Sequence, residues 1–218
     1  MPDAFATDPA THAYYDARAR EYDEWYLGTG LFASRERAGW DQEVAALVEV
    51  VRALPPARTL DVACGTGFLT RHLRGPAVVG LDQSAEMVAV AQARMPEAVV
   101  VRGDALALPF ADGAFDRVLT GHFYGHLPPD ERARFLAEAR RVARGGELVV
   151  LDSAPRPDRP AEGWQERVLN DGSVHRVFKR YLSGPALAEE LGGDAEVLLD
   201  GAWFSAARAA AGPAPSRP

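Results

Sequence analysis

Apolar and polar residues form alternating blocks along the middle of the chain, and the blocks have the lengths of strands and helices. Five short apolar runs predict strands at residues 58–63, 77–82, 98–104, 115–120 and 147–153. Their Val, Leu and Ala residues are nearly continuous, as expected for strands that are buried on both faces. The helix-like segments between them indicate right-handed strand–helix–strand units and therefore a parallel sheet.

Two of the intervening helices carry clear end signals. Ser84 is a suitable N-cap for a helix at 84–95, in which Met87 lies on the apolar face. The segment 129–144 begins with Pro and acidic residues and ends with arginines before two glycines, which fits the helix dipole and a glycine C-cap. A shorter helix is predicted at 68–73.

The flanking segments predict further helices and a terminal hairpin. Residues 9–27 form an amphipathic helical stretch rich in Tyr and Trp, and 31–54 predict a second helix. A Pro-rich loop at 154–163 comes before the sequence GPALAEELGG, which predicts a short helix ended by two glycines. Residues 195–209 predict two strands joined at Asp200-Gly201, which fits an antiparallel edge on a parallel sheet.

These elements predict one domain of the α/β class with a doubly wound sheet. The 218 residues, 47% of them hydrophobic, suffice for one full core. The expected division of residues 1–209 is a helical lid at 1–40, a cofactor-binding core at 41–153, an acceptor-side cap and helix at 154–194, and a terminal hairpin at 195–209, followed by a flexible tail at 210–218.

Composition limits the class of ligand. There are 24 Lys and Arg against 31 Asp and Glu, a net charge of −7 that disfavours nucleic acid as the main partner. A single cysteine, Cys64, gives no disulfide within the chain and no metal-ligand spacing, so we expect no metal site. With no signal-peptide pattern and no apolar run of membrane-spanning length, we expect a cytoplasmic protein without a membrane partner.

The sequence ACGTG follows the first predicted strand, at the edge of the sheet where folds of this class bind ligands. Gly65 and Gly67 let the backbone approach a ligand closely. Asp82 ends the second predicted strand, where a carboxylate can accept hydrogen bonds from ribose hydroxyls. Such a loop suits either a nicotinamide dinucleotide or S-adenosylmethionine.

Three positions separate these two cofactors. Thr70 stands where the dinucleotide fingerprint requires Gly or Ala. Asp61 precedes the loop, where a carboxylate would repel a pyrophosphate and attract an ammonium group. Asp104 precedes the small apolar Ala105, a pair that suits an adenine ring and its amino group. Each acid could instead cap a turn or a helix, but acids at three successive strand ends favour S-adenosylmethionine.

The segments LDVACGTG, VVGLD, VVRGDALALPF and FDRVLTGHFYGHL, followed by ARGGELVV, together resemble the class I S-adenosylmethionine-dependent methyltransferases. The resemblance covers residues 10–209 and implies a Rossmann-like, mostly parallel seven-stranded sheet with an antiparallel last strand. Ala63 departs from the family's glycine-rich motif, which usually has Gly there, but alanine is the smallest replacement.

The resemblance also implies a set of site residues. The implied cofactor-binding residues are Tyr14, Tyr22, Asp61, Ala63, Cys64, Gly65, Gly67, Asp82, Gln83, Met87, Asp104, Ala105, Thr120 and His122. Within this set, the loop from 61 to 67 would hold the methionine moiety, Asp82 the ribose and Asp104 the adenine edge. Thr120 and His122 would border the sulfonium, and the Cys64 side chain is interpreted as a small filler.

Methyl transfer from a sulfonium is an in-line displacement, for which the protein mainly supplies alignment. An oxygen or nitrogen acceptor also has to lose a proton, which a positioned histidine can take. His122 and His126 both follow the fourth strand, and His122 is the better catalytic candidate. A structural hydrogen bond is the alternative for His126, and an acceptor that arrives ionised needs no base.

The N-terminal sequence YYDARAREYDEWY resembles a segment that folds over the cofactor in many small members of the family. Tyr14, Tyr22 and Trp25 are spaced to lie near one helical face. Packing against the core is the alternative for this aromatic stripe. We expect a lid that contributes to cofactor binding.

The segment HRVFKRYL at 175–182 either binds an anionic acceptor or forms a strand with one solvated face. Trp164 and Tyr181 are candidates for the wall of an apolar acceptor pocket. The function that the resemblance implies is O- or N-methylation of a small molecule. An NAD(P)-dependent reductase and a non-catalytic S-adenosylmethionine-binding protein are the alternatives. The acceptor and the oligomeric state stay open.

Overall fold

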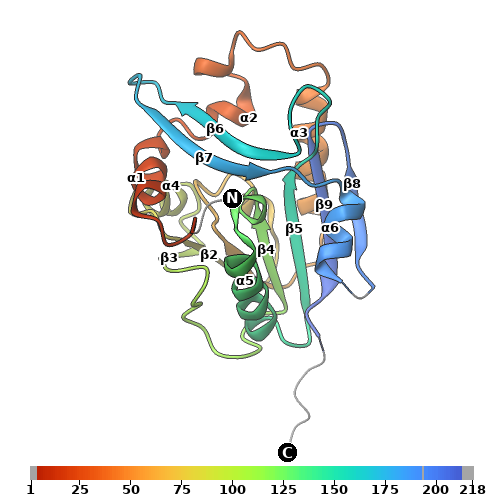
Figure 1. Ribbon diagram of the computed structural model, residues 1–218. Helices are drawn as coiled ribbons and strands as arrows, with labels where there is room; N and C mark the ends of the chain where they lie inside the picture. Colours follow the sequence, from red (N-terminus) through yellow and green to blue (C-terminus); the bar gives the residue numbers. More distant parts are fainter. Residues whose placement is uncertain (1–3, 193, 213–218) are drawn as a thin grey trace, which may run out of the picture.

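The computed structural model describes residues 4–192 and 194–212. A seven-stranded sheet lies at its centre, with the strand order β3-β2-β1-β4-β5-β9-β8 (Figure 1). The strands are β1 (Arg58–Val62), β2 (Ala77–Asp82), β3 (Val99–Arg102), β4 (Arg117–Gly121), β5 (Glu147–Ser153), β8 (Glu196–Asp200) and β9 (Phe204–Ala210). Strands β1 to β5 pair in parallel, whereas β9 pairs antiparallel with β5 and β8. The predicted doubly wound sheet with an antiparallel last strand is confirmed.

Helices cover both faces of this sheet. The α-helices are α1 (Pro9–Arg18), α2 (Glu24–Leu27), α3 (Trp40–Ala53), α4 (Ala85–Arg94), α5 (Pro129–Val142) and α6 (Gly184–Leu191), and the 3₁₀ helices are η1 (Gly30–Phe32), η2 (Thr70–His72) and η3 (Tyr124–His126). Side chains of α5 and α6 pack on one face, and those of α3 pack on the other. Within the described residues, no helix is long and apolar enough to cross a membrane.

Strand β5 shows why the sequence of the strands is almost continuously apolar. Leu148 and Val150 join the core cluster that contains α5, whereas Val149 and Leu151 join the cluster that contains α3. All four side chains are at most 1% exposed. Because helices cover both faces, every position of the strand faces a core, and burial of each such side chain contributes about 1.5–3 kcal/mol.

The N-terminal helices are shorter than the sequence predicts. The stretch 9–27 forms α1 and α2, which a turn at 19–23 separates. The predicted helix at 31–54 begins only at Trp40, because Gly39 before it has a φ of 75°. This left-handed conformation suits glycine and cannot continue a helix.

Other differences concern element ends. The stretch 68–73 forms only the turn η2, because Gly75 and Pro76 follow too closely for an α-helix to propagate. Strand β3 ends at Arg102, before the predicted end at residue 104. Strand β9 extends to Ala210, the first residue of the tail predicted at 210–218, and the part of that tail from residue 213 onward lies outside the described residues.

A separate two-stranded sheet covers one edge of the main sheet. It consists of β6 (Glu162–Val168) and β7 (Val174–Arg180), which pair antiparallel. This hairpin lies across the carboxyl ends of the parallel strands, and its tip reaches toward α1 (Figure 1). Asn170 in the tip donates its backbone N–H to Glu21 at 2.8 Å and its amide group to Glu24 at 3.1 Å. The hairpin and the N-terminal helices therefore form a joined cap.

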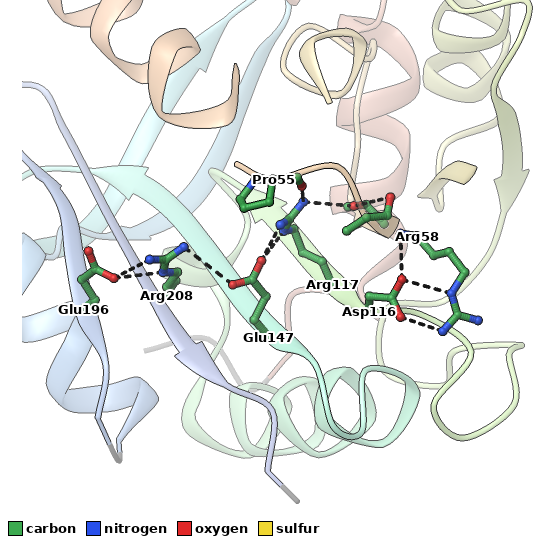
Figure 2. Close-up of polar contacts among 9 residues, drawn as sticks. Pro55, Arg58, Asp116, Arg117, Glu147, Glu196 and Arg208 are labelled. Carbon is green, nitrogen blue, oxygen red and sulfur yellow. Dashed lines mark hydrogen bonds and ion pairs between the residues drawn. The ribbon is translucent and has the colours of Figure 1, made fainter. Parts of the chain in front are cut away.

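A row of ion pairs closes the opposite edge, where β1, β4 and β5 begin (Figure 2). Arg117 of β4 is 2% exposed and donates Nε to Glu147 of β5 at 2.6 Å. Glu147 also lies 3.9 Å from Arg208 of β9. The row continues into the more exposed pairs Arg58 with Asp116 and Arg208 with Glu196.

Candidate functional site

The loop after β1 turns sharply at the carboxyl edge of the sheet. Ala63, Gly65 and Gly67 have φ values of 57°, 55° and 74°. At Gly67, a Cβ would meet the end of the flexible Met95 side chain at 2.7 Å, so this position favours glycine chiefly for its conformation. Ala63 adopts the same left-handed region with a Cβ, which costs roughly 1–2 kcal/mol.

Asp82 fixes this loop from the end of β2. Its carboxylate accepts the Gly65 N–H and the Ser84 N–H, each at 2.9 Å. Asp82 is only 7% exposed, and burial raises its pKa. A carboxylate has about four lone-pair sites, so two stay available for a ligand. Asp82 therefore makes the capping hydrogen bonds that were the alternative to ribose binding, and these leave lone pairs for a ligand.

The loop, β2 and the N-terminal segment enclose a small cavity of about 40 Å³, here called the inner cavity. It is lined by Phe5, Tyr15, Tyr22, Ala63, Gly65, Leu81, Asp82, Gln83, Met87, Gly103, Ala105, Gly121, His122 and Phe123. The structure thus brings together eight of the cofactor-binding residues that the sequence implied: Tyr22, Ala63, Gly65, Asp82, Gln83, Met87, Ala105 and His122.

The other residues implied by the sequence lie outside this lining. The Asp104 carboxylate accepts the Leu106 N–H at 2.8 Å, which is the turn-capping alternative. The Thr120 hydroxyl donates to the Val62 carbonyl at 2.7 Å and ties β4 to β1. Cys64 is buried beside Ala91 and Met95, as expected for a filler. Gly67 packs against Met95, and Tyr14 lines a different cavity.

Asp61 lies behind the loop, where it is 2% exposed. Its carboxylate accepts the Thr70 hydroxyl at 2.5 Å. Burial raises the pKa of Asp61 to about 7, although the hydrogen bond from Thr70 opposes this shift. The residue that argued against a dinucleotide fingerprint, Thr70, thus has a defined role in holding the first acid of the loop.

Sequence reasoning missed several residues of the inner cavity. Phe5 precedes the predicted helix and carries no pattern of its own. It reaches the site because its N–H and that of Ala6 donate to the Glu131 carboxylate on α5, both at 2.9 Å. Tyr15 lines the inner cavity and Tyr14 does not, because the orientation of α1 decides which of these two neighbours faces the cavity.

A larger cleft of about 310 Å³, here called the outer cleft, lies between the N-terminal segment and the hairpin β6–β7. Tyr15, Tyr22 and His122 line both the inner cavity and the outer cleft. Of the two residues expected to wall an acceptor pocket, Tyr181 lines the cleft, whereas Trp164 does not and is 48% exposed. Because Tyr15, Tyr22 and His122 line both, the inner cavity and the outer cleft are adjacent.

His122 stands at this junction with a φ of 58°. It is 7% exposed, Trp25 lies edge-on to its ring, and its Nδ1 lies 3.5 Å from the Ser153 hydroxyl. Its Nε2 has no hydrogen-bond partner among the described residues. Burial lowers the pKa of His122 to about 3, with Asp152 opposing and Lys179 adding to the shift. The imidazole is therefore neutral at pH 7, and Nε2 is the ring atom left for a ligand.

His126, the second catalytic candidate, has a structural role in this arrangement. Its Nδ1 is 2.5 Å from the Phe178 carbonyl, and its ring stacks on Phe5 at 4.7 Å. Burial lowers its pKa well below the ordinary value, and Lys179 adds to the shift. His126 joins η3 to the hairpin and the N-terminal segment, although it also lines the outer cleft.

Comparison with known proteins places this site in a family. The profile of a family described as "Methyltransferase domain" matches residues 60–151. A demethylmenaquinone methyltransferase of Thermotoga maritima is 37% identical over 146 residues, 65% of this chain and 60% of that protein. One from Thermobifida fusca is 35% identical over 167 residues, 72% of this chain and 67% of that protein. The chain spans between 49% and 67% of the length of the demethylmenaquinone methyltransferases it matches.

Solved structures match over nearly the whole chain. The DhpI–SAH complex is 28% identical with a TM-score of 0.71, covering 99% of this chain and 100% of that one. The DhpI–SAM–HEP complex is 26% identical with a TM-score of 0.73, covering 95% and 98%. The N-terminal segment, the hairpin β6–β7 and the terminal strands are therefore all within the part of the chain that matches one known architecture.

Proposed function

Because this chain belongs to the class I S-adenosylmethionine-dependent methyltransferase family, we propose that it transfers a methyl group to an oxygen or nitrogen atom of a small molecule. The observation that carries the proposal is the junction at His122. One side chain borders both the inner cavity and the outer cleft, so a donor in the first can face an acceptor in the second. In-line displacement requires this adjacency.

The residues of the inner cavity fit S-adenosylmethionine. Asp82 has free lone pairs for two ribose hydroxyls, and Met87 and Ala105 provide apolar walls for an adenine ring. Gly65 brings backbone to the cavity, and Asp61 lies behind it with a carboxyl group of pKa about 7, which a nearby ammonium group would favour in its ionised form. When bound, this cofactor supplies the methyl group as part of a sulfonium.

The chain itself aligns the methyl donor with the acceptor, excludes water from the junction and supplies a side chain that can take a proton. Tyr15, Tyr22 and Trp25 place aromatic rings around the junction, which excludes water from it. The Nε2 atom of neutral His122 can accept a hydrogen bond from an acceptor hydroxyl or amine. Because the pKa of His122 is lowered to about 3, it is a weak base, and it takes the proton only as the new bond to the methyl group makes that proton strongly acidic. We infer this role for His122 and a structural one for His126.

The proposal extends to the parts of the chain and to its partners. Residues 1–40 act as the lid, 41–153 as the cofactor core, 154–194 as the acceptor-side cap, and 195–209 as the closing hairpin. Several relatives are named for demethylmenaquinone methylation, which supports a metabolite as the acceptor rather than a macromolecule. The net charge of −7 agrees with a cytoplasmic enzyme that has no nucleic-acid or membrane partner.

Titration calorimetry with S-adenosylhomocysteine and with NADH tests the cofactor. We expect S-adenosylhomocysteine to bind and NADH not to bind. Asp82→Ala should lose roughly tenfold or more in affinity, because it removes a charged acceptor from a buried site. Asp116→Ala, which removes a carboxylate from the opposite edge of the sheet, serves as the control. Equal affinity of the Asp82→Ala variant and the wild type would reject the ribose role.

Catalysis needs a separate test, because a protein with this fold can bind the cofactor without turnover. A methyl-transfer screen over phenols, amines, carboxylates, phosphates and thiols should find a methylated product. His122→Asn should then lower kcat with little effect on S-adenosylhomocysteine affinity if the acceptor has to lose a proton. Cofactor binding without any methylated product would favour a non-catalytic role.

A further inference from the structure

The outer cleft is strongly cationic in a chain that is acidic overall. Seven Arg and Lys side chains line it, against the carboxylates Glu21, Glu36 and Glu166. The whole chain has a net charge of −7, so this concentration of positive charge is local. These cationic side chains line the same cleft as His122, so they would contact a methyl acceptor bound there.

Most of these cations already have partners on the protein. Lys179 is 3% exposed and forms a buried ion pair with Asp152, and Arg156 pairs with Asp158 at 2.7 Å. Arg37 donates to the Trp25 carbonyl at 2.9 Å and lies over the Trp40 ring. Such groups are held by their partners and form the walls of the cleft.

Two arginines differ from the rest. Among the described residues, Arg35 and Arg167 make no ion pair and no side-chain hydrogen bond, although Arg35 lies over the Phe32 ring at 4.7 Å from its centroid. Arg167 is half-buried on the inner face of β6, opposite His175, so its guanidinium turns toward the cleft. Arg35 comes from the segment between η1 and α3, and the two side chains approach the cleft from separate elements.

The positive charge in the cleft lowers the pKa of neighbouring side chains. Burial lowers the pKa of Arg35, and the charges of Arg167 and Arg159 lower it further. Burial alone would raise the pKa of Tyr181, but hydrogen bonds from Gln165 and Arg159 and the charge of Arg167 lower it. Arginines that repel one another across a cleft are stabilised by an anion between them.

We propose that the methyl acceptor carries an oxyanion group, a carboxylate or a phosphate-type group, which Arg35 and Arg167 bind together in the outer cleft. The proposal rests on the methyl-transfer function above and specifies its substrate class. Guanidinium groups suit it because each presents several N–H donors in a plane that matches two oxyanion oxygens. It also changes the earlier expectation of an apolar acceptor pocket, since the apolar Trp164 points away from the cleft.

Calorimetry on the full chain saturated with S-adenosylhomocysteine tests the proposal with matched probes. Benzoate is compared with benzamide and phenyl phosphate with its neutral dimethyl ester, so that each pair differs chiefly in charge. The two pairs also separate a carboxylate from a phosphate-type site. We expect an anion to bind at least tenfold more tightly than its neutral partner and to weaken as salt increases.

Variants locate the effect. Arg167→Gln and Arg35→Gln should each weaken anion binding roughly tenfold or more and leave S-adenosylhomocysteine affinity unchanged. Arg176→Gln is the matched control, because Arg176 lies on the exposed face of the same hairpin, over the Trp164 ring and outside the cleft lining. Equal binding of charged and neutral probes, or equal losses in the Arg167 and Arg176 variants, would overturn the proposal. Failure of S-adenosylhomocysteine itself to bind would reject the methyltransferase function instead.

Discussion

Ala63 and His122 are the two non-glycine residues with positive φ among the described residues, and both lie at the carboxyl edge of the sheet. Local strain at such positions persists only where the surrounding structure enforces it. At Ala63 the enforcing contacts come from the loop geometry that brings Gly65 to Asp82. The backbone of the site is therefore strained, and this strain lowers the free energy of unfolding by an amount that can be measured.

Substitution of Ala63 measures this cost. Ala63→Gly should raise the free energy of unfolding by about 0.5 kcal/mol, because relief of left-handed strain exceeds the extra entropy of glycine in the unfolded chain. Ala63→Val should lower it by about 2 kcal/mol, because a β-branched side chain is poorly tolerated at positive φ. Urea unfolding of the three proteins gives the order, and a destabilised Ala63→Gly variant would contradict the strain argument.

The buried Asp61 gives a pH dependence with a defined sign. Its pKa is about 7 in the folded protein and about 3.9 in the unfolded chain. Between these values the unfolded state loses the proton first, so stability falls as pH rises from 4 to 7. Asp61→Asn removes this penalty and can still accept the Thr70 hydroxyl.

The stability of Asp61→Asn relative to the wild type should therefore increase from pH 4 to pH 8, by roughly 2–4 kcal/mol. Urea unfolding at four or five pH values measures this difference. A constant difference across the range would show that the pKa of Asp61 in the folded protein is the same as in the unfolded chain. Affinity for S-adenosylhomocysteine, whose amino group is cationic, should rise with pH in the wild type and stay flat in the variant.

At the scale of elements, the central strands and most helix ends were predictable because their signals are local. Strand β5 is apolar at every position because both faces are buried, and α4 begins at the Ser84 cap, which accepts the Met87 N–H at 3.1 Å. The ends of β1 and β2 then fixed Gly65 and Asp82 at one edge by topology alone.

The covering elements were not predictable in the same way. Strand β6 alternates between partly buried and exposed residues, and its sequence EGWQERV has few apolar residues to mark the inner face. Phe5 reaches the inner cavity only through hydrogen bonds to Glu131, 126 residues away in the chain. Contacts of that range leave no periodic pattern in the sequence.

The N-terminal segment closes the inner cavity, and this predicts a lid that moves. The cavity of about 40 Å³ is far smaller than the several hundred Å³ typical of cofactor sites, and Phe5, Tyr15 and Tyr22 of the N-terminal segment line it. The Tyr22 ring lies over Gly65, where a Cβ would meet it at 3.7 Å. Entry of a nucleoside therefore requires this segment to open and to close again.

Tyr22→Ala should weaken S-adenosylhomocysteine binding by roughly tenfold, because a buried aromatic contact is worth more than 1 kcal/mol. Bound S-adenosylhomocysteine should also slow tryptic cleavage at Arg18 and Arg20 in the wild type. Arg20→Ala, an exposed change on the same segment, is the control for affinity. Unchanged affinity in the Tyr22→Ala variant would leave the segment with a packing role only.

At the scale of the whole molecule, the amino and carboxyl edges of the sheet differ in whether their charged side chains form ion pairs. At the amino edge, arginines and carboxylates alternate and neutralise one another (Figure 2). At the carboxyl edge, Arg35 and Arg167 have no such partners among the described residues, and Asp82 keeps free lone pairs. The difference separates a stabilising edge from a ligand-binding edge, and it predicts that changes at the first leave binding intact.

Arg117 is the residue that tests this separation, because it is 2% exposed and joins β4 to β5 through Glu147. Arg117→Ala should lower the free energy of unfolding by roughly 2–4 kcal/mol, since it leaves the Glu147 carboxylate partly buried without its partner. Arg117→Met, which keeps the packed stem without the charge, should cost less than Arg117→Ala. Arg58→Ala, which breaks an exposed pair in the same row, should shift the urea midpoint least.

All three variants should bind S-adenosylhomocysteine like the wild type at temperatures where they are folded. A loss of affinity in folded Arg117→Ala would instead show that the strand register set at the amino edge controls the geometry of the carboxyl edge.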